Sequence, residues 1–153
     1  SLAALADEVL CDLAPIADQK QIKFSQSETD CIVTGSYLLL YRAVFNLVEN
    51  AIKYNNMDGW VHVSLNADHQ FFYVRVEDSG IGIPKDSQGK VFERFYRVDK
   101  ARSRETGGTG LGLSIVKNII LMHHGTIKLY SEEGMGTTFT FRIPLNYVEE
   151  DEK

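Results

Sequence analysis

Four polar residues in the middle of the chain recur at helical spacing. Asn46, Glu49, Asn50 and Lys53 stand at offsets of 0, 3, 4 and 7 residues, so on a helix they share one side. A carboxamide oxygen suits a hard cation such as Mg²⁺, and a lysine ammonium suits a phosphate group. The spacing therefore indicates either a magnesium–phosphate site or a solvent-exposed polar face, and this segment alone does not decide between them.

An aspartate and two glycines follow the predicted strand Phe71 to Val76. Asp78 could accept a hydrogen bond from an exocyclic amine. Gly80 and Gly82 would let the backbone approach a flat ligand closely, because neither carries a Cβ atom. The alternative interpretation is a glycine turn after an edge strand.

A third segment, Gly107 to Leu113, is rich in glycine and leads into an apolar helix. Free N–H groups and the helix dipole make such a helix start an anion site. The spacing matches neither the mononucleotide loop GxxxxGK[ST] nor the dinucleotide fingerprint GxGxxG within a βαβ unit. A helix cap with a flexible hinge remains the alternative.

The hydrophobic pattern predicts the elements that position these segments. Helices are expected over residues 2–19, from Ser36 to about Tyr54, and over 111–122, and strands over 22–24, 31–33, 60–65, 71–76, 127–130 and 137–143. A short helix is expected near 88–92. This order predicts an α+β domain with one layer of helices on one mixed sheet of about five or six strands.

Two helices carry specific expectations about burial. On the second helix the side chains of Leu38, Tyr41, Phe45, Val48 and Ile52 are expected to face the core, because they fall on one arc. The third helix is apolar nearly all round and is therefore expected to be buried.

Length and composition exclude several classes of protein. The 153 residues are 44% apolar and 24% charged, which fits one globular domain with a core of its own. Sixteen basic against twenty-one acidic residues give a net charge of −5, so no nucleic-acid surface is expected. No run of 18 apolar residues exists, so no membrane contact is expected. Cys11 and Cys31 lack metal-ligand spacing. Because the chain starts at Ser1, we expect one domain of a longer protein.

Taken together and in this order, the segments resemble the ATP-binding catalytic domain of bacterial sensor histidine kinases, within the superfamily of gyrase, Hsp90 and MutL. The resemblance covers nearly the whole chain. Five sequence boxes of the family carry it. The N box is similar to Asn46–Tyr54 and the G1 box to Asp78–Gly82. The F box is similar to Phe92–Arg97, the G2 box to Gly108–Leu113 and the last glycine box to Gly134–Phe139.

The resemblance implies a two-layer α/β sandwich of the Bergerat type, with Mg-ATP held between the helices and a lid over about 84–107. Asp78 would bind the adenine amino group, with Thr138 assisting through water and Tyr54 near the base. Asn50 would ligate Mg²⁺. The residues it places at ATP are Asn46, Asn50, Lys53, Tyr54, Asp78, Gly80, Gly82, Ile83, Gly108, Thr109, Gly110, Leu111, Gly112, Leu113 and Thr138.

The resemblance also implies phosphoryl transfer. Asn46, Asn50 and Lys53 would act with Arg97 and Arg102, the arginines expected to neutralise the γ-phosphate. Members that hydrolyse ATP have a glutamate where this chain has Asn46. An amide is a poor base, whereas a neutral imidazole with a pKa near 6.5 needs little help to attack, so Asn46 favours a histidine acceptor.

None of the four histidines matches the acceptor motif His–Glu/Asp–x–x–x–Pro of the family. The implied acceptor is therefore a separate dimerisation domain of the same kinase, in the cytoplasm, and the full-length protein would serve a response regulator. Two alternatives stay open. One is a nucleotide-sensing module without phosphotransfer, and the other is an ATP-gated clamp like gyrase or Hsp90, which Asn46 and the short lid disfavour.

Overall fold

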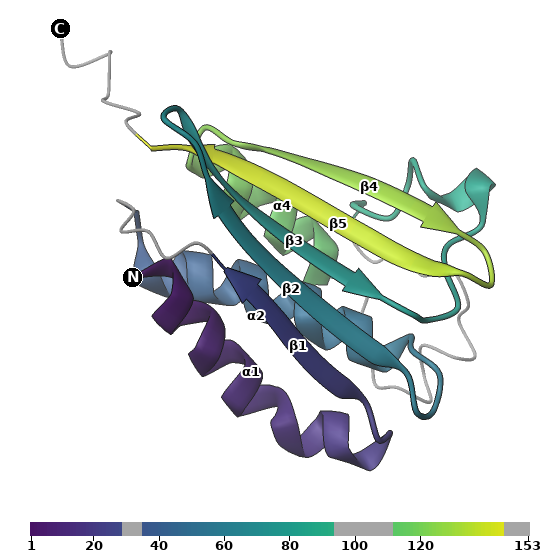
Figure 1. The fold of residues 1–153 in the computed structure, drawn as a ribbon. Coiled ribbons are helices and arrows are strands. Elements are labelled where there is room, and N and C mark those ends of the chain that lie inside the picture. The colour runs from purple at the N-terminus through teal and green to yellow at the C-terminus, as the bar shows by residue number, and fades with distance from the viewer. Residues whose placement is uncertain (29–34, 94–111, 146–153) are drawn as a thin grey trace, which may run out of the picture.

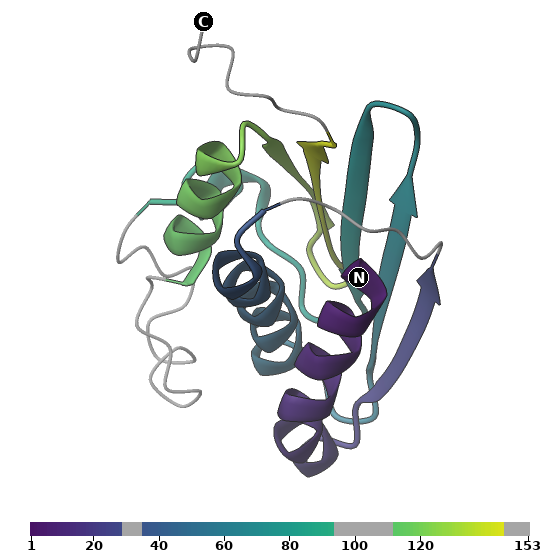
Figure 2. The same ribbon diagram turned by 90° about the vertical axis from the view of Figure 1, so that its left-hand side faces the viewer.

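A computed structural model describes residues 1–28, 35–93 and 112–145 of the chain. In these residues three α-helices cover one face of a single five-stranded sheet, which confirms the predicted two-layer α+β arrangement (Figures 1 and 2). The helices are α1 (Leu2–Gln19), α2 (Tyr37–Lys53) and α4 (Gly112–Met122), and the strands are β1 (Lys23–Glu28), β2 (Trp60–Ala67), β3 (Phe71–Asp78), β4 (Thr126–Glu132) and β5 (Gly136–Pro144).

The sheet has the strand order β1-β2-β3-β5-β4. β1 pairs with β2 in parallel, and the other three pairs are antiparallel, so the sheet is mixed as predicted. The register sets Asp78, the last residue of β3, opposite Thr137 near the start of β5. The predicted strand over 31–33 lies outside the described residues.

Helix α2 lies between α1 and α4 in the helical layer (Figure 2). It begins after Ser36, whose hydroxyl accepts the Leu39 N–H at 3.3 Å as an N-cap. Its buried side includes Leu40, Leu47 and Ile52. The expectation that Leu38 faces the core is wrong, because Leu38 is 75% exposed. It precedes Leu40 by two residues and therefore points to nearly the opposite side of the helix.

Helix α4 buries only one side, so the expectation that it is buried all round is wrong. Val116, Ile119 and Ile120 are buried, whereas Leu121 is 55% and Met122 is 62% exposed. The reason is position: α4 packs against α2 and against strands β4 and β5, which together cover only part of its surface. None of the helices within the described ranges is long and apolar enough to cross a membrane.

The stretch after β3 forms the 3-10 helix η1 (Lys85–Ser87), and the chain then turns through residue 93. The expected short helix over 88–92 is therefore wrong in place and type. Pro84, with φ −55°, starts the turn early. The side-chain amide of Gln88 then donates to the carbonyl oxygens of Ile83 at 2.9 Å and Ser131 at 3.0 Å. These bonds tie Gln88 to the sheet and favour a turn there.

Candidate functional site

A pocket lies where the C-terminal end of α2 meets the end of β3 and the segment that follows it. It is lined by Asn50, Tyr54, Asp78, Ile81, Gly82, Ile83 and Thr137. Five of these residues were predicted from the sequence to contact ATP, namely Asn50, Tyr54, Asp78, Gly82 and Ile83. Ile81 and Thr137 were not predicted. The fold therefore brings the N box and the G1 box to the same pocket, although they are separated by strands β2 and β3.

The carboxyl group of Asp78 is the charged centre of this pocket. Its Oδ1 accepts the Gly80 N–H at 2.8 Å, which fixes the side chain. Burial raises the pKa of Asp78 to about 6, although hydrogen bonds from the backbone N–H groups of Gly80 and Thr137 act in the opposite direction. A carboxylate has about four lone-pair positions, so Asp78 can accept a further donor from a ligand. A fixed and partly desolvated acceptor of this kind is typical of a binding site.

Thr137, rather than the predicted Thr138, stands beside Asp78. Side chains alternate along a strand, and Thr137 shares the buried side of β5 with Phe139 and Phe141, so Thr138 points to the other face of the sheet. The structure thus places Thr137, and not Thr138, in the wall of the pocket that contains Asp78. The alternation of buried aromatic residues at 139 and 141 is the sequence signal that could have found it.

The hydroxyl of Thr137 has a fixed hydrogen-bond role. Ser131 Oγ donates to the Gly136 oxygen at 2.9 Å and accepts the Ile83 N–H at 2.8 Å. Because a serine hydroxyl has one hydrogen, Thr137 Oγ1, which lies 2.9 Å from Ser131 Oγ, must be the donor of that pair. The remaining lone pairs of Thr137 Oγ1 are acceptors at the pocket wall.

The two glycines after Asp78 also have a reason within the fold itself. A Cβ atom on Gly80 would fall inside 3.0 Å of the Tyr54 carbonyl oxygen, and one on Gly82 inside 3.0 Å of the Glu132 carbonyl oxygen. Gly82 also has φ +74°, a conformation that side chains rarely adopt. These glycines let the segment pass between the end of α2 and the β4–β5 turn, where the main chain packs too closely for a Cβ atom.

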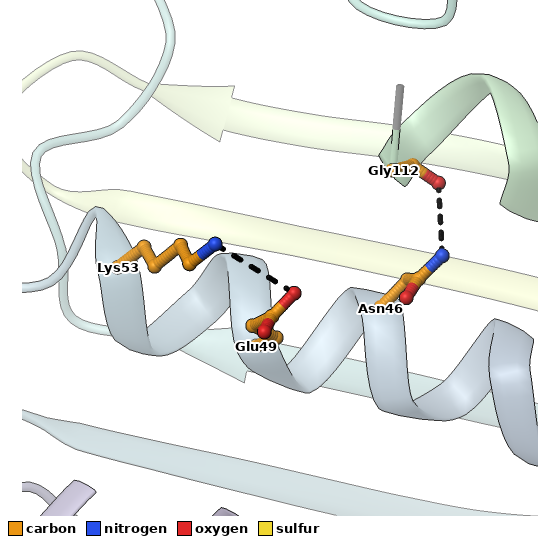
Figure 3. A network of polar contacts seen from close by, with 4 residues as sticks. All are labelled: Asn46, Glu49, Lys53 and Gly112. Atoms are coloured by element: carbon orange, nitrogen blue, oxygen red, sulfur yellow. Dashed lines mark hydrogen bonds and ion pairs between the residues drawn. The ribbon is translucent and has the colours of Figure 1, made fainter. Parts of the chain in front are cut away.

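Asn46 joins α2 to the start of α4. It is only 8% exposed, and its Nδ2 donates to the Gly112 carbonyl oxygen at 3.4 Å (Figure 3). Gly112 is the first residue of α4, and Leu113 after it is half-buried against the core. The other predicted phosphate-loop residues, Gly108, Thr109, Gly110 and Leu111, lie outside the described residues, as do Arg97 and Arg102.

Lys53 and Glu49 form an ion pair one turn apart on α2, with 3.8 Å between Nζ and Oε1 (Figure 3). Both side chains keep about a quarter to a third of their surface exposed, so the pair is weak and can open to another partner. The predicted polar side of α2 is thus divided. Asn50 lines the pocket with Asp78, Asn46 contacts α4, and Lys53 lies along the side with Glu49.

Residues 35–147 match the family model described as histidine kinase-, DNA gyrase B-, and HSP90-like ATPase. The chain belongs to this family. It is 50% identical over 129 residues to the sensor-like histidine kinase SenX3 of Mycolicibacterium smegmatis, covering 84% of this chain and 34% of that protein. It is 50% identical over 109 residues to the sensor histidine kinase WalK of Bacillus subtilis, covering 70% and 18%. The chain thus spans about a third or less of these relatives.

Solved structures of histidine kinases share the fold. The mycobacterial sensor histidine kinase MprB is 32% identical with a TM-score of 0.80, and the match covers 94% of this chain and 95% of that one. Full-length ShkA in complex with AMPPNP is 26% identical with a TM-score of 0.81, covering 97% and 31%. The Bergerat-type fold predicted by the resemblance is confirmed by these neighbours.

Proposed function

We propose that residues 1–153 are the single ATP-binding catalytic domain of a sensor histidine kinase. In this proposal the domain binds Mg-ATP and donates the γ-phosphoryl group to a histidine on a separate dimerisation domain of the same protein. The observation that carries it is the pocket that joins Asn50 and Tyr54 on α2 to Asp78 at the end of β3. The family match and the sensor-kinase relatives support the same assignment.

The residues at the pocket fit an adenine nucleotide with its metal. Asp78 is a fixed acceptor for the adenine amino group, and Thr137 Oγ1 offers a second acceptor beside it. The carboxamide oxygen of Asn50 is a hard ligand suited to Mg²⁺, which usually takes one or two protein ligands and completes its shell with phosphates and water. When bound, the metal would neutralise charge on the phosphates. Lys53 would contact phosphate by leaving Glu49.

The geometry at Asn46 favours a kinase over a hydrolase. Its amide donates to the Gly112 carbonyl oxygen, so the side chain presents a hydrogen-bond donor and no base at this position. Water needs a base to attack a phosphoryl group, whereas a neutral imidazole is already nucleophilic. Arg97 and Arg102 remain predicted partners of the γ-phosphate. The lid proposed over 84–107 would complete the positioning of the nucleotide. In this proposal the domain lies in the cytoplasm, and the full-length protein serves a response regulator.

The test mixes the purified domain with the dimerisation domain of the parent protein and γ-labelled ATP. The expected result is label on histidine that requires Mg²⁺, and its loss in Asn50→Asp, which adds a charge beside three phosphates and alters the metal ligand. The matched control Asn118→Asp makes the same change on an exposed position of α4 and should transfer label normally. Nucleotide binding without transfer would instead favour the nucleotide-sensing module, and no binding would reject the whole proposal.

A further inference from the structure

Lys20 at the end of α1 contacts the end of α2 through its side chain. Its Nζ lies 2.7 Å from the Lys53 carbonyl oxygen, 3.2 Å from that of Ile52 and 3.4 Å from that of Asn55. An ammonium has three donors, and three acceptors surround it here. Lys20 lies outside residues 35–147, so the family match says nothing about it.

The contact supplies hydrogen-bond donors to the C-terminal end of helix α2. The last four carbonyl groups of a helix have no partner within it and form the negative end of its dipole. In many helices a glycine just after the last turn, or a basic side chain near the C-terminus of the same helix, satisfies them. Here a cation from a different helix does so, and the position of the α2 terminus therefore depends on where α1 ends.

The main chain reinforces this dependence. The carbonyl oxygen of Lys20 accepts the Asp58 N–H at 2.9 Å, and the Lys23 N–H donates to the Gly59 carbonyl oxygen at 3.0 Å. The turn between α2 and β2, residues 54–59, is thus held on one side by the connection from α1 to β1.

The other side of the same turn is bonded to the segment next to Asp78. Asn55 is 1% exposed, and its Nδ2 donates to the Trp60 carbonyl oxygen at 3.0 Å, while its Oδ1 accepts from Ser79 Oγ at 3.1 Å. The Tyr54 carbonyl oxygen accepts the Ile81 N–H at 3.1 Å. Tyr54 and Ile81 both line the pocket. A displacement of the turn would therefore move the pocket wall relative to Asp78.

We propose that Lys20 is a positioning residue of the nucleotide site, which acts by fixing the turn that carries Tyr54 beside Asp78. The inference rests on the proposed function. It also connects α1 to the nucleotide site. A shift of α1 would move the ammonium away from the three carbonyl oxygens and loosen the part of the pocket that contains Tyr54 and Asp78.

The experiment compares three variants of the full chain. Lys20→Met keeps the length of the side chain and removes its donors, Lys20→Arg restores donors, and Lys23→Met removes an exposed lysine three residues away. The Kd for MgADP is measured at a temperature where circular dichroism shows each variant fully folded. Coupling between positions of this kind changes affinity by about 2- to 30-fold. We expect Lys20→Met to raise the Kd within this range, Lys20→Arg to recover most of the loss, and Lys23→Met to match the wild type.

A second measurement needs no nucleotide. Trp60 is the single tryptophan of the chain, and its carbonyl group is bonded to Asn55, so its fluorescence reports on the turn. Lys20→Met should shift the emission of Trp60, and Lys20→Arg should return it. If Lys20→Met does not fold, Lys20→Gln, which keeps a donor, gives the same comparison in a milder form.

The outcomes separate this inference from the proposed function. An unchanged Kd in folded Lys20→Met, with nucleotide binding by the wild type, would overturn the inference alone and leave Lys20 a purely stabilising residue. An unchanged Trp60 emission in Lys20→Met would also overturn it. No binding of nucleotide by the wild type would overturn the proposed function and, with it, the role of Lys20 at the site.

Discussion

The side-chain nitrogen of Asn46 lies 3.4 Å from the main-chain oxygen of Gly112, which connects the middle of α2 to the first residue of α4. The direction of this bond matters, because the side chain is the donor and a carbonyl group can only accept. An amide satisfies this geometry, whereas a carboxylate of the same size would place negative charge against the carbonyl oxygen. Asn46 thus has a structural reason to be an amide, independent of any nucleotide.

Asn46→Asp should therefore destabilise the nucleotide-free domain. The change removes the donor of a part-buried hydrogen bond, which costs about 0.5–1.5 kcal/mol. Urea unfolding measures the loss, with Asn118→Asp as the control for the same substitution on an exposed site of α4. Equal stability of both variants would show that the contact with Gly112 contributes nothing.

Asp78→Asn should make the nucleotide-free domain more stable at neutral pH. The pKa of Asp78 is about 6 when folded, against 3.8 for the ordinary side chain, so the folded state resists its ionisation. Each pKa unit corresponds to about 1.4 kcal/mol, and since Asp78 is only partly buried we expect a gain of about 1–2 kcal/mol. The asparagine oxygen can still accept the Gly80 N–H.

The pKa values of Asp78 in the unfolded and folded states set the pH range over which this difference in stability changes. Between about pH 4 and 6 the folded state binds more protons at Asp78 than the unfolded state does, so the wild type loses stability as pH rises through this range. The advantage of Asp78→Asn should therefore be complete above pH 6 and disappear below pH 4. Urea titrations at pH 4, 5 and 7 measure it, and a constant difference between the two proteins would contradict the prediction.

Nucleotide binding should respond to the same group in the opposite sense. An ionised Asp78 accepts from the adenine amino group, so affinity for adenine nucleotides should fall as pH drops through about 6. Asp78→Asn should bind more weakly at pH 7.5, prefer ATP over GTP less, and lose this pH dependence. Calorimetry with both nucleotides separates the effect from titration of the phosphates, which both proteins experience. Equal losses for ATP and GTP would mean that Asp78 supports the loop and does not contact the base.

The main elements of the fold could be predicted from the sequence because local pattern decides them. The bounds of α1 and the cap of α2 at Ser36 follow from apolar spacing and a capping hydroxyl. Burial of single residues could not be predicted as well. The errors at Leu38 and Leu121 arose because a helical pattern gives an apolar arc, whereas the neighbours α1, α2 and α4 decide how much of it is covered.

The candidate site, too, could be predicted only in part. The resemblance to histidine kinases implied that Asn50, Tyr54 and Asp78 lie at one ATP site, and the structure brings all three to one pocket. The choice between Thr137 and Thr138 depends on strand register, since one residue along a strand exchanges the two faces of the sheet. Lys20 carries no motif at all, and only the packing of α1 against α2 connects it to the pocket.

The glycines offer a test of packing that needs no ligand. Gly82 has φ +74°, and a Cβ atom there would fall inside 3.0 Å of the Glu132 carbonyl oxygen. Gly82→Ala should therefore destabilise the domain by about 1–3 kcal/mol, the usual cost of a strained conformation, and more if the β4–β5 turn cannot move.

Gly89 is the matched control, because a Cβ atom there meets nothing within 4 Å. Gly89→Ala should change the free energy of unfolding by no more than about 0.5 kcal/mol. Equal, small effects of the two substitutions in urea unfolding would mean that the glycine at 82 serves ligand approach, as first predicted, rather than the packing of the chain on Glu132.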